Sequence, residues 1–148
     1  MHITRYTDYS LRILIYLAAN DGELCTIGEI AKSYDISKNH LMKIVQDLSA
    51  RGYLLAVRGK NGGLRLNTEP SNINIGELVR QFEQDSKLVE CFGSGNQCVI
   101  TPACQLKAIF AEAMESFFAT LDRYTLEDLL GGSKKETVRE LLFINAAS

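Results

Sequence analysis

The sequence predicts a mainly α-helical chain that carries one small β-hairpin. Two observations lead to this class. Apolar residues recur with helical spacing in several separate segments, and a glycine-rich turn lies between two short β-prone runs. The chain has 148 residues, of which 46% are hydrophobic and 23% are charged, so it is long enough to bury one core.

Three helices are expected in the first part of the chain. The first should run from about residue 4 or 7 to residue 20, because apolar residues recur at i, i+3, i+4 and i+7: Leu11, Leu14, Ile15 and Ala18. Thr26 and Glu29 have the spacing of a capping box, which starts a short second helix. Ser37 is expected to cap a third helix that ends at Gly52 and buries Leu41, Ile44, Val45 and Leu48. The second and third helices, joined by a tight turn, form a helix-turn-helix.

A hairpin is expected directly after these helices. Two β-prone runs, residues 53–58 and 64–66, flank a glycine-rich turn, and Asn61-Gly62 within it is a strong hairpin signal. Three helices followed by a hairpin with a basic tip form a winged helix. Residues 1–70 are therefore expected to be a winged helix-turn-helix DNA-binding domain.

The distribution of charge supports a polyanionic partner. Residues 37–65 contain six basic side chains and one acidic side chain, a net charge of +5, although the whole chain has a net charge of −2. A basic block in an acidic protein is typical of a nucleic-acid contact surface. The expected contact residues occupy the start of the third helix and the hairpin tip: Ser37, Lys38, Asn39, His40, Lys43, Arg58, Lys60 and Asn61.

Residues 71–132 are expected to form a cluster-binding and dimerisation region. Asn74 and Glu77 cap a fourth helix. The longest periodic run then predicts a dimerisation helix with one apolar stripe: Leu106, Ile109, Phe110, Ala113, Met114, Phe117, Phe118 and Leu121. A symmetric homodimer would present the two DNA-reading surfaces that a palindromic operator requires. Residues 133–148 are interpreted as a C-terminal tail without an assigned role.

A cysteine-rich loop precedes the long helix. Cys91, Cys98 and Cys104 follow the spacing C-x6-C-x5-C in a glycine-rich, polar segment, which favours a metal site over core packing. Thr101 and Pro102 are expected to begin a helix with Cys104 in its first turn, where thiolates are favoured. The N-terminus lacks a signal peptide and no run reaches membrane-spanning length, so a cytoplasmic location is expected. Persistent disulfides are uncommon in that reducing compartment.

Several stretches together resemble one family, the winged-helix repressors with an iron-sulfur cluster that include IscR. The similarity extends to about residue 130 and is strongest in residues 7–12, 14–16, 37–44, 56–66, 98–104 and 121–129. It points to the nitric-oxide-sensing branch of the family. The resemblance implies a homodimer, a cluster held by Cys91, Cys98 and Cys104, and repression of genes that detoxify nitric oxide.

The chain departs from the family pattern at one position. IscR-like members carry a histidine three residues after the third cysteine, and this chain has Lys107 there, which cannot bind metal as an ammonium. The candidates for the fourth ligand are Asp8, His2, His40, Cys25 and water. For the nitric-oxide-sensing branch the resemblance implies Asp8 of the partner subunit. The residues alone favour a structural carboxylate that pairs with Arg12 at i+4.

The expected function is an iron-sulfur-dependent repressor that senses nitric oxide through cluster nitrosylation and then loses DNA binding. The cluster is expected to be 4Fe-4S, with 2Fe-2S as the alternative. Other possible functions are a regulator that senses iron-sulfur status or oxidation, and a zinc-stabilised DNA-binding module, since three thiolates and a carboxylate also suit zinc. The chain shows no catalytic triad, phosphate loop or carboxylate pair, so an enzyme is not expected.

Overall fold

Helix α1 (Arg5–Ala19) lies at the centre of the N-terminal half of the protein. The computed structural model describes residues 2–144. The Thr4 hydroxyl caps α1 by accepting a hydrogen bond from a backbone amide of the first turn, and Asn20 follows the last turn. The expected first helix is therefore confirmed. Three of its large apolar side chains are at most 1% exposed and form the middle of the core: Ile13, Leu14 and Leu17.

Helices α2 (Ile27–Tyr34) and α3 (Lys38–Ala50) form the expected helix-turn-helix. The capping box is present, because the Thr26 hydroxyl accepts from the Glu29 amide and the Glu29 carboxylate accepts from the Thr26 amide. Asp35 adopts the left-handed conformation, with φ of 53°, and turns the chain between the two helices. The buried face of α3 is the expected one: Leu41, Ile44, Val45 and Leu48.

The two ends of α3 differ in detail from the expectation. Ser37 occupies the N-cap position, but its side chain makes no capping hydrogen bond. The helix ends at Ala50, with Arg51 as its C-cap, rather than at Gly52. Gly52 instead has φ of 88°, a conformation that favours glycine, and it turns the chain toward the hairpin.

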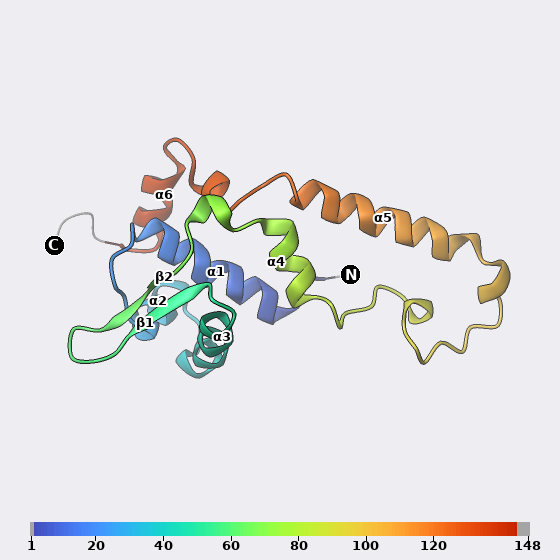
Figure 1. Cartoon of the computed structure of the whole chain (residues 1–148), viewed down its shortest axis with the longest axis horizontal. Helices are drawn as coiled ribbons and strands as arrows, with labels where there is room; N and C mark the ends of the chain where they lie inside the picture. The colour runs from blue at the N-terminus through green and yellow to red at the C-terminus, as the bar shows by residue number, and fades with distance from the viewer. Residues whose placement is uncertain (1, 145–148) are drawn as a thin grey trace.

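The hairpin pairs β1 (Leu54–Val57) with β2 (Gly63–Leu66) as an antiparallel two-stranded sheet. Gly62 is required by close contact, because a β-carbon there would lie 2.0 Å from the carbonyl oxygen of the last residue of β1. Cys25 forms an isolated bridge with Leu64, so the segment before α2 also pairs with the hairpin. The wing of the predicted winged helix is thus confirmed (Figure 1).

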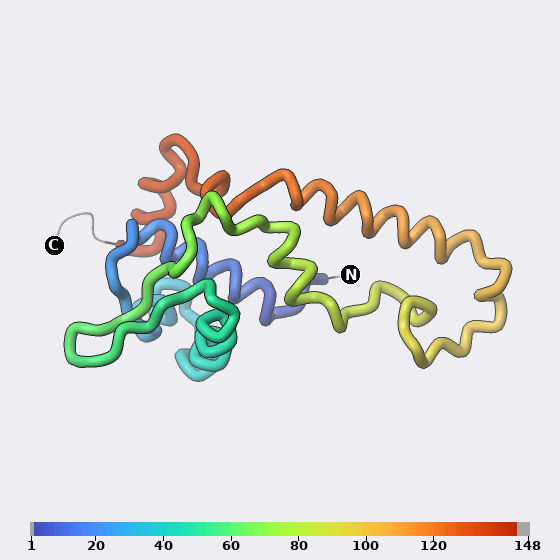
Figure 2. The backbone as a smooth tube through the Cα atoms, viewed as in Figure 1, coloured from blue at the N-terminus to red at the C-terminus, as the bar shows by residue number. Residues whose placement is uncertain are grey.

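After α4 (Ile75–Phe82) the chain leaves the body of the molecule as an arm, defined here as residues 83–121 (Figure 1 and Figure 2). A loop with the 3-10 turns η2 (Glu90–Phe92) and η3 (Thr101–Ala103) runs outward, and α5 (Gln105–Leu121) runs back toward α4. No residue of α5 is buried. Within residues 2–144, no helix is long and apolar enough to cross a membrane.

Polar contacts attach the base of the arm to α4. The Arg80 guanidinium donates to both carboxylate oxygens of Asp122, at 2.5 and 2.7 Å. This contact lowers the pKa of Asp122 through the hydrogen bond from Arg80. The Asn74 side chain donates to the Asp122 carbonyl oxygen, and a β-carbon on Gly76 would lie 1.9 Å from the Asp122 carboxylate. The sequence alone signals none of these contacts, because they join residues far apart in the chain.

The segment for which the sequence indicated no role returns to the body. After the 3-10 turn η4 (Glu127–Leu130), helix α6 (Lys134–Leu141) packs against α1. The Arg139 guanidinium is buried and donates to the Ala19 carbonyl oxygen, and Leu142 joins the core. Residues 133–144 therefore complete the body around α1, and the last part of the expected tail lies outside the described residues.

Candidate DNA-binding surface and cysteine cavity

The expected DNA contacts on the third helix lie together on its exposed face. Ser37, Lys38, Asn39, His40 and Lys43 are all exposed, whereas the opposite face of α3 is buried. Because the buried stripe anchors α3 in the core, these polar side chains are held outward at one end of the helix. This arrangement suits contacts with base edges and phosphates.

The hairpin tip supplies the remaining expected contacts. Arg58, Lys60 and Asn61 are exposed in the turn that joins β1 to β2. The hairpin projects from the body beside α2 and α3 in Figure 1. We call the exposed residues of α3 and of this tip the basic surface: Ser37, Lys38, Asn39, His40, Lys43, Arg58, Lys60 and Asn61. A narrow tip that carries cations is suited to the minor groove and its phosphates.

Aromatic contacts connect the basic surface to α1. The rings of Tyr9 and His40 are 6.3 Å apart between centroids. The Arg12 guanidinium lies 5.4 Å from the centre of the Tyr9 ring and 5.8 Å from that of Tyr34. Burial raises the pKa of Tyr34 to about 12, so its hydroxyl stays protonated and donates to the Arg12 carbonyl oxygen. The first turns of α1 are thus packed directly against the start of α3.

The three clustered cysteines line one cavity near the tip of the arm. Cys91, Cys98 and Cys104 are free thiols, and they surround a cavity of about 210 Å³ that we call the cysteine cavity. Its other walls are largely apolar, with Val89, Ile100, Leu106 and Phe110 among them. Three free thiols around one cavity are a donor set that would suit an iron-sulfur cluster, because cysteine thiolates are the usual ligands of such clusters.

Hydrogen bonds organise the loop between the cysteines. The Asn96 side chain donates to the Thr101 hydroxyl at 2.8 Å and accepts from the Cys98 amide at 3.0 Å. The Thr101 hydroxyl in turn donates to the Cys98 carbonyl oxygen. Glycines favour flexibility in such a loop, but these contacts give the part around Cys98 a defined conformation.

The expected position of Cys104 is wrong. Thr101 and Pro102 begin the separate turn η3 instead of a long helix, and α5 begins only at Gln105. Cys104 is therefore the N-cap residue of α5, in an extended conformation, and not a residue of its first turn. The proline is compatible with either start, and the sequence pattern could not distinguish them.

The structure separates the candidates for a fourth ligand. Cys25 is 4% exposed in the hydrophobic core, and burial raises the pKa of its thiol to about 12. His40 lies on the basic surface and His2 lines a different cavity. Asp8 is held by Arg12, and it does not line the cysteine cavity of its own chain. Within residues 2–144, no three His, Cys, Asp or Glu side chains are grouped to hold a single metal ion.

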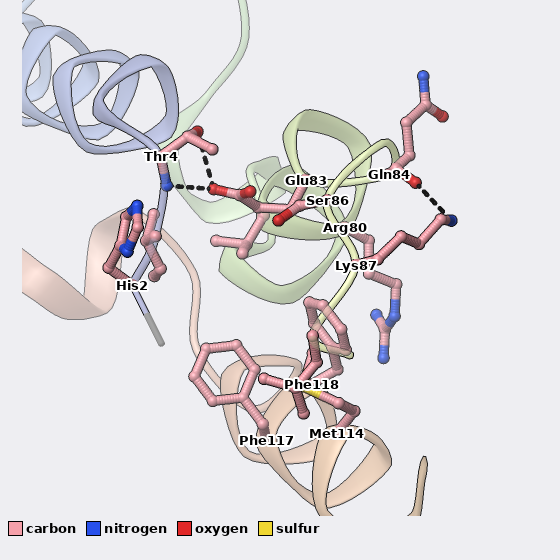
Figure 3. A pocket seen from close by; sticks show the side chains of 13 residues that line it. His2, Thr4, Arg80, Glu83, Gln84, Ser86, Lys87, Met114, Phe117 and Phe118 are labelled. Atoms are coloured by element: carbon pink, nitrogen blue, oxygen red, sulfur yellow. Dashed lines mark hydrogen bonds between the residues drawn. The ribbon is translucent and has the colours of Figure 1, made fainter. Parts of the chain in front are cut away.

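A second cavity, of about 560 Å³, lies between α4, the N-terminal segment and α5 (Figure 3). Met114, Phe117 and Phe118 of α5 line it on one side. On the other side the Glu83 carboxylate accepts hydrogen bonds from the amide and the hydroxyl of Thr4, at 2.8 and 2.9 Å. Part of the expected dimerisation stripe therefore faces its own chain.

The outer part of the arm leaves apolar side chains in solvent. Leu106 and Ile109 are 52% and 57% exposed, and Val99 and Ile100 are 91% and 60% exposed. The stripe continues past the start of α5 into the loop, which the helical period could not predict. Single exposed apolar residues are common on proteins, but a contiguous set is typical of an interaction surface.

Comparison with known proteins identifies the family. The family model described as Rrf2, iron-dependent transcriptional regulator, matches residues 3–132. The HTH-type transcriptional regulator NsrR of Bacillus subtilis is 51% identical over 144 residues, which cover 96% of this chain and 97% of the relative. NsrR of Bacillus licheniformis is 49% identical over 144 residues, covering 96% of this chain and 99% of the relative.

A solved structure supports the fold. T. potens IscR matches with a TM-score of 0.67 at 23% sequence identity, covering 100% of this chain and 94% of that one. These relatives are transcriptional regulators and not enzymes. The winged-helix fold and the resemblance inferred from the sequence are both confirmed. The chain belongs to the Rrf2 family of transcriptional regulators, and NsrR proteins are among its close relatives.

Proposed function

We propose that this protein is a cytoplasmic, homodimeric repressor that binds a palindromic operator and releases it when nitric oxide reacts with an iron-sulfur cluster. The observation that carries this proposal is the cysteine cavity in a chain 51% identical to an NsrR protein. Free thiols at one cavity provide the donor set, and nitric oxide as the signal is what the family resemblance of the sequence implies.

DNA binding is assigned to the basic surface. Lys43, Lys60 and Arg58 would contact phosphates, while Asn39 and Asn61 would contribute to sequence preference. A dimer would use the exposed apolar residues of the arm, since Leu106 and Ile109 are 52% and 57% exposed in the single chain. Two-fold symmetry would then present two basic surfaces to the two halves of an operator.

The cluster would be held by Cys91, Cys98 and Cys104 of one subunit and by Asp8 of the partner subunit. In one chain the cysteines lie on the arm, while α1 belongs to the body (Figure 1). A second copy would supply Asp8 as the fourth ligand, since Asp8 does not line the cysteine cavity of its own chain. We expect a 4Fe-4S cluster, with 2Fe-2S as the alternative. When bound, the cluster supplies iron sites that react with nitric oxide.

The packing of α1 offers a way to connect this site with DNA. Asp8 lies in the first turns of α1, and its neighbour Tyr9 contacts His40 at the start of α3. A carboxylate bound at the partner's arm would fix the position of α1, and with it the basic surface. Release of that carboxylate would let the two basic surfaces leave the spacing that an operator demands.

The experiment is to purify the protein anaerobically and to measure iron, sulfide, zinc and the visible spectrum. Operator binding is then titrated with the cluster-loaded, metal-free and nitric-oxide-treated forms at two salt concentrations. We expect a coloured protein that binds tightly only when loaded and untreated. A colourless zinc protein, or metal-free protein that binds the operator as tightly as loaded protein, would overturn the proposal. A loaded form insensitive to nitric oxide but responsive to oxidation would identify a different signal.

A further inference from the structure

Met42 is an apolar side chain on the polar, outward face of α3. It is 47% exposed. Among the residues of α3, all of which the structure describes, Met42 is the one large hydrophobic side chain that is exposed. The apolar residues that anchor this helix in the core occupy its opposite face. Met42 is therefore accessible to a partner that approaches α3 from outside.

Polar side chains surround Met42 on this face of the helix. Lys38 and Asn39 lie one helical turn before it and Gln46 lies one turn after it, and all three are exposed. A helical side chain points back toward the N-terminus of its own helix, so the thioether of Met42 covers the turn that carries Lys38 and Asn39. The N-terminal part of a recognition helix is the part that meets base edges in the major groove.

The major groove of B-DNA presents one apolar group that reports sequence, the C5-methyl group of thymine. The other groups that distinguish the base pairs there are hydrogen-bond donors and acceptors, which suit Lys, Asn and Gln but not a thioether. A methionine side chain is unbranched and polarizable, so it can adapt its shape to a methyl group. Contact between the two would remove apolar surface of both from water, which is favourable.

We propose that Met42 reads thymine: in each half of the operator it contacts the C5-methyl group of one thymine in the major groove. Met42 is thus a specificity-determining residue, whereas its neighbour Lys43 would contact a phosphate. The inference rests on the DNA binding that the proposed function assigns to the basic surface, and it depends on neither the metal nor the signal. A 5-methylcytosine carries the same methyl group and should be recognised at the same place.

The test begins with anaerobically purified, full-length wild-type protein, which selects its preferred sites from a library of random DNA duplexes. Each thymine of the selected site is then replaced in turn, in both halves of the site, by deoxyuridine. Deoxyuridine pairs as thymine does but lacks the methyl group. Fluorescence anisotropy gives the affinity for each duplex at one salt concentration. The variants are Met42→Ala, Met42→Leu, which keeps an apolar side chain of similar volume, and Lys43→Ala as the control for a lost phosphate contact.

The measured quantity is the ratio of the affinities for the thymine and the deoxyuridine duplex. At one thymine in each half-site we expect a wild-type ratio of about fifteen, or about fourfold for each methyl group buried. Met42→Ala should bind both duplexes equally, and Met42→Leu should keep most of the ratio. Lys43→Ala should bind both duplexes more weakly with the wild-type ratio. Since Met42 is exposed, Met42→Ala should keep the wild-type melting temperature.

A second comparison places cytosine or 5-methylcytosine at the same positions, opposite guanine. Wild-type protein should prefer the methylated duplex about fourfold for each half-site, and Met42→Ala should show no preference. A wild-type ratio near one at every thymine, or a ratio unchanged in Met42→Ala, would overturn the proposal and leave DNA binding in place. A wild-type protein that binds no DNA in any form would instead overturn the proposed function, and this inference with it.

Discussion

Asp8 and Arg12 form a two-point ion pair on α1, with Arg12 Nε donating to Asp8 Oδ1 at 3.2 Å and Nη2 donating to Oδ2 at 3.0 Å. The two side chains remain 47% and 40% exposed. An exposed pair of this kind contributes only about 0–1 kcal/mol to stability. The Asp8 carboxylate can therefore exchange Arg12 for another cation at small cost, which is compatible with its proposed role as a ligand in the partner's site.

Replacement of Asp8 tests that role. We expect Asp8→Ala to fold normally, to lose its cluster to a chelator about tenfold faster and to show an altered visible spectrum, because one ligand is missing. Arg12→Ala is the matched control, since it breaks the same ion pair but keeps the carboxylate. If Asp8→Ala and Arg12→Ala retained clusters with the same spectrum and lifetime as wild type, the carboxylate would not be a ligand.

A histidine at position 107 should compensate for the loss of Asp8. Lys107 lines the cysteine cavity, so an imidazole at that position could reach the metal site within the same chain. We expect Asp8→Ala/Lys107→His to retain its cluster about as long as wild type. Nitric oxide should release it from the operator only weakly, because the link to α1 of the partner subunit is gone. Iron content, chelator kinetics and operator titrations measure this. A double variant as labile as Asp8→Ala would contradict it.

The basic surface can be tested residue by residue. Lys43→Ala should weaken operator binding about three- to tenfold. It should also reduce the slope of log affinity against log salt concentration by about one for each phosphate contact removed. Asn39→Ala and Asn61→Ala should also alter sequence preference. Contacts with base edges and grooves select the DNA sequence, whereas contacts with phosphates only position the protein on the duplex. Lys134→Ala, on α6, is the charge-matched control. Unchanged affinity of Lys43→Ala and Lys60→Ala at low and high salt would show that the DNA-binding surface lies elsewhere.

The arm offers two positions that separate dimerisation from folding. Ile109 is 57% exposed, so Ile109→Asp should leave the isolated chain stable but place a charge in the apolar dimer interface. A penalty of at least about 3 kcal/mol corresponds to a roughly hundredfold weaker dimer. Phe117 lines the cavity against α4, so Phe117→Asp should also lower the melting temperature. Glu115→Gln is the control for a change of charge elsewhere on α5.

Sedimentation velocity and thermal unfolding distinguish these outcomes. The expected result is a monomeric, folded Ile109→Asp and a destabilised Phe117→Asp. A stable Ile109→Asp dimer, or a monomeric wild type, would show that the arm does not form the dimer interface.

Cys25 should be unreactive in the native protein. With a pKa of about 12 from burial, about one Cys25 thiol in ten thousand is ionised at pH 8, and the thiolate is the reactive form. Iodoacetamide should therefore label metal-free native protein at Cys91, Cys98 and Cys104, and should label Cys25 only after denaturation. Peptide mass spectrometry locates the labels. Rapid native labelling of Cys25 would show that the segment before α2 opens readily.

The sequence alone determined the elements whose signals are local. Helix periodicity, the Thr26 and Glu29 capping box and the glycine-rich turn each act within a few residues, so helices α1 to α5, the hairpin and the exposed face of α3 could be predicted, whereas α6 lies in the segment interpreted as a tail. The same holds for the spacing of the three cysteines and for the basic block between residues 37 and 65. A helix start is less certain, because a cap followed by proline suits a 3-10 turn as well as an α-helix, and Cys104 was misplaced for this reason.

Only the tertiary structure decided which distant residues meet. The ion pair of Arg80 with Asp122, the hydrogen bonds that Thr4 donates to Glu83 and the return of α6 onto α1 join segments widely separated in the chain. The apolar stripe of α5 carries no information on which half faces its own chain, so the structure alone divided it into a covered part near Phe117 and an exposed part near Ile109. Local signals report backbone preference and side-chain period, whereas these contacts depend on how the elements pack once they have formed.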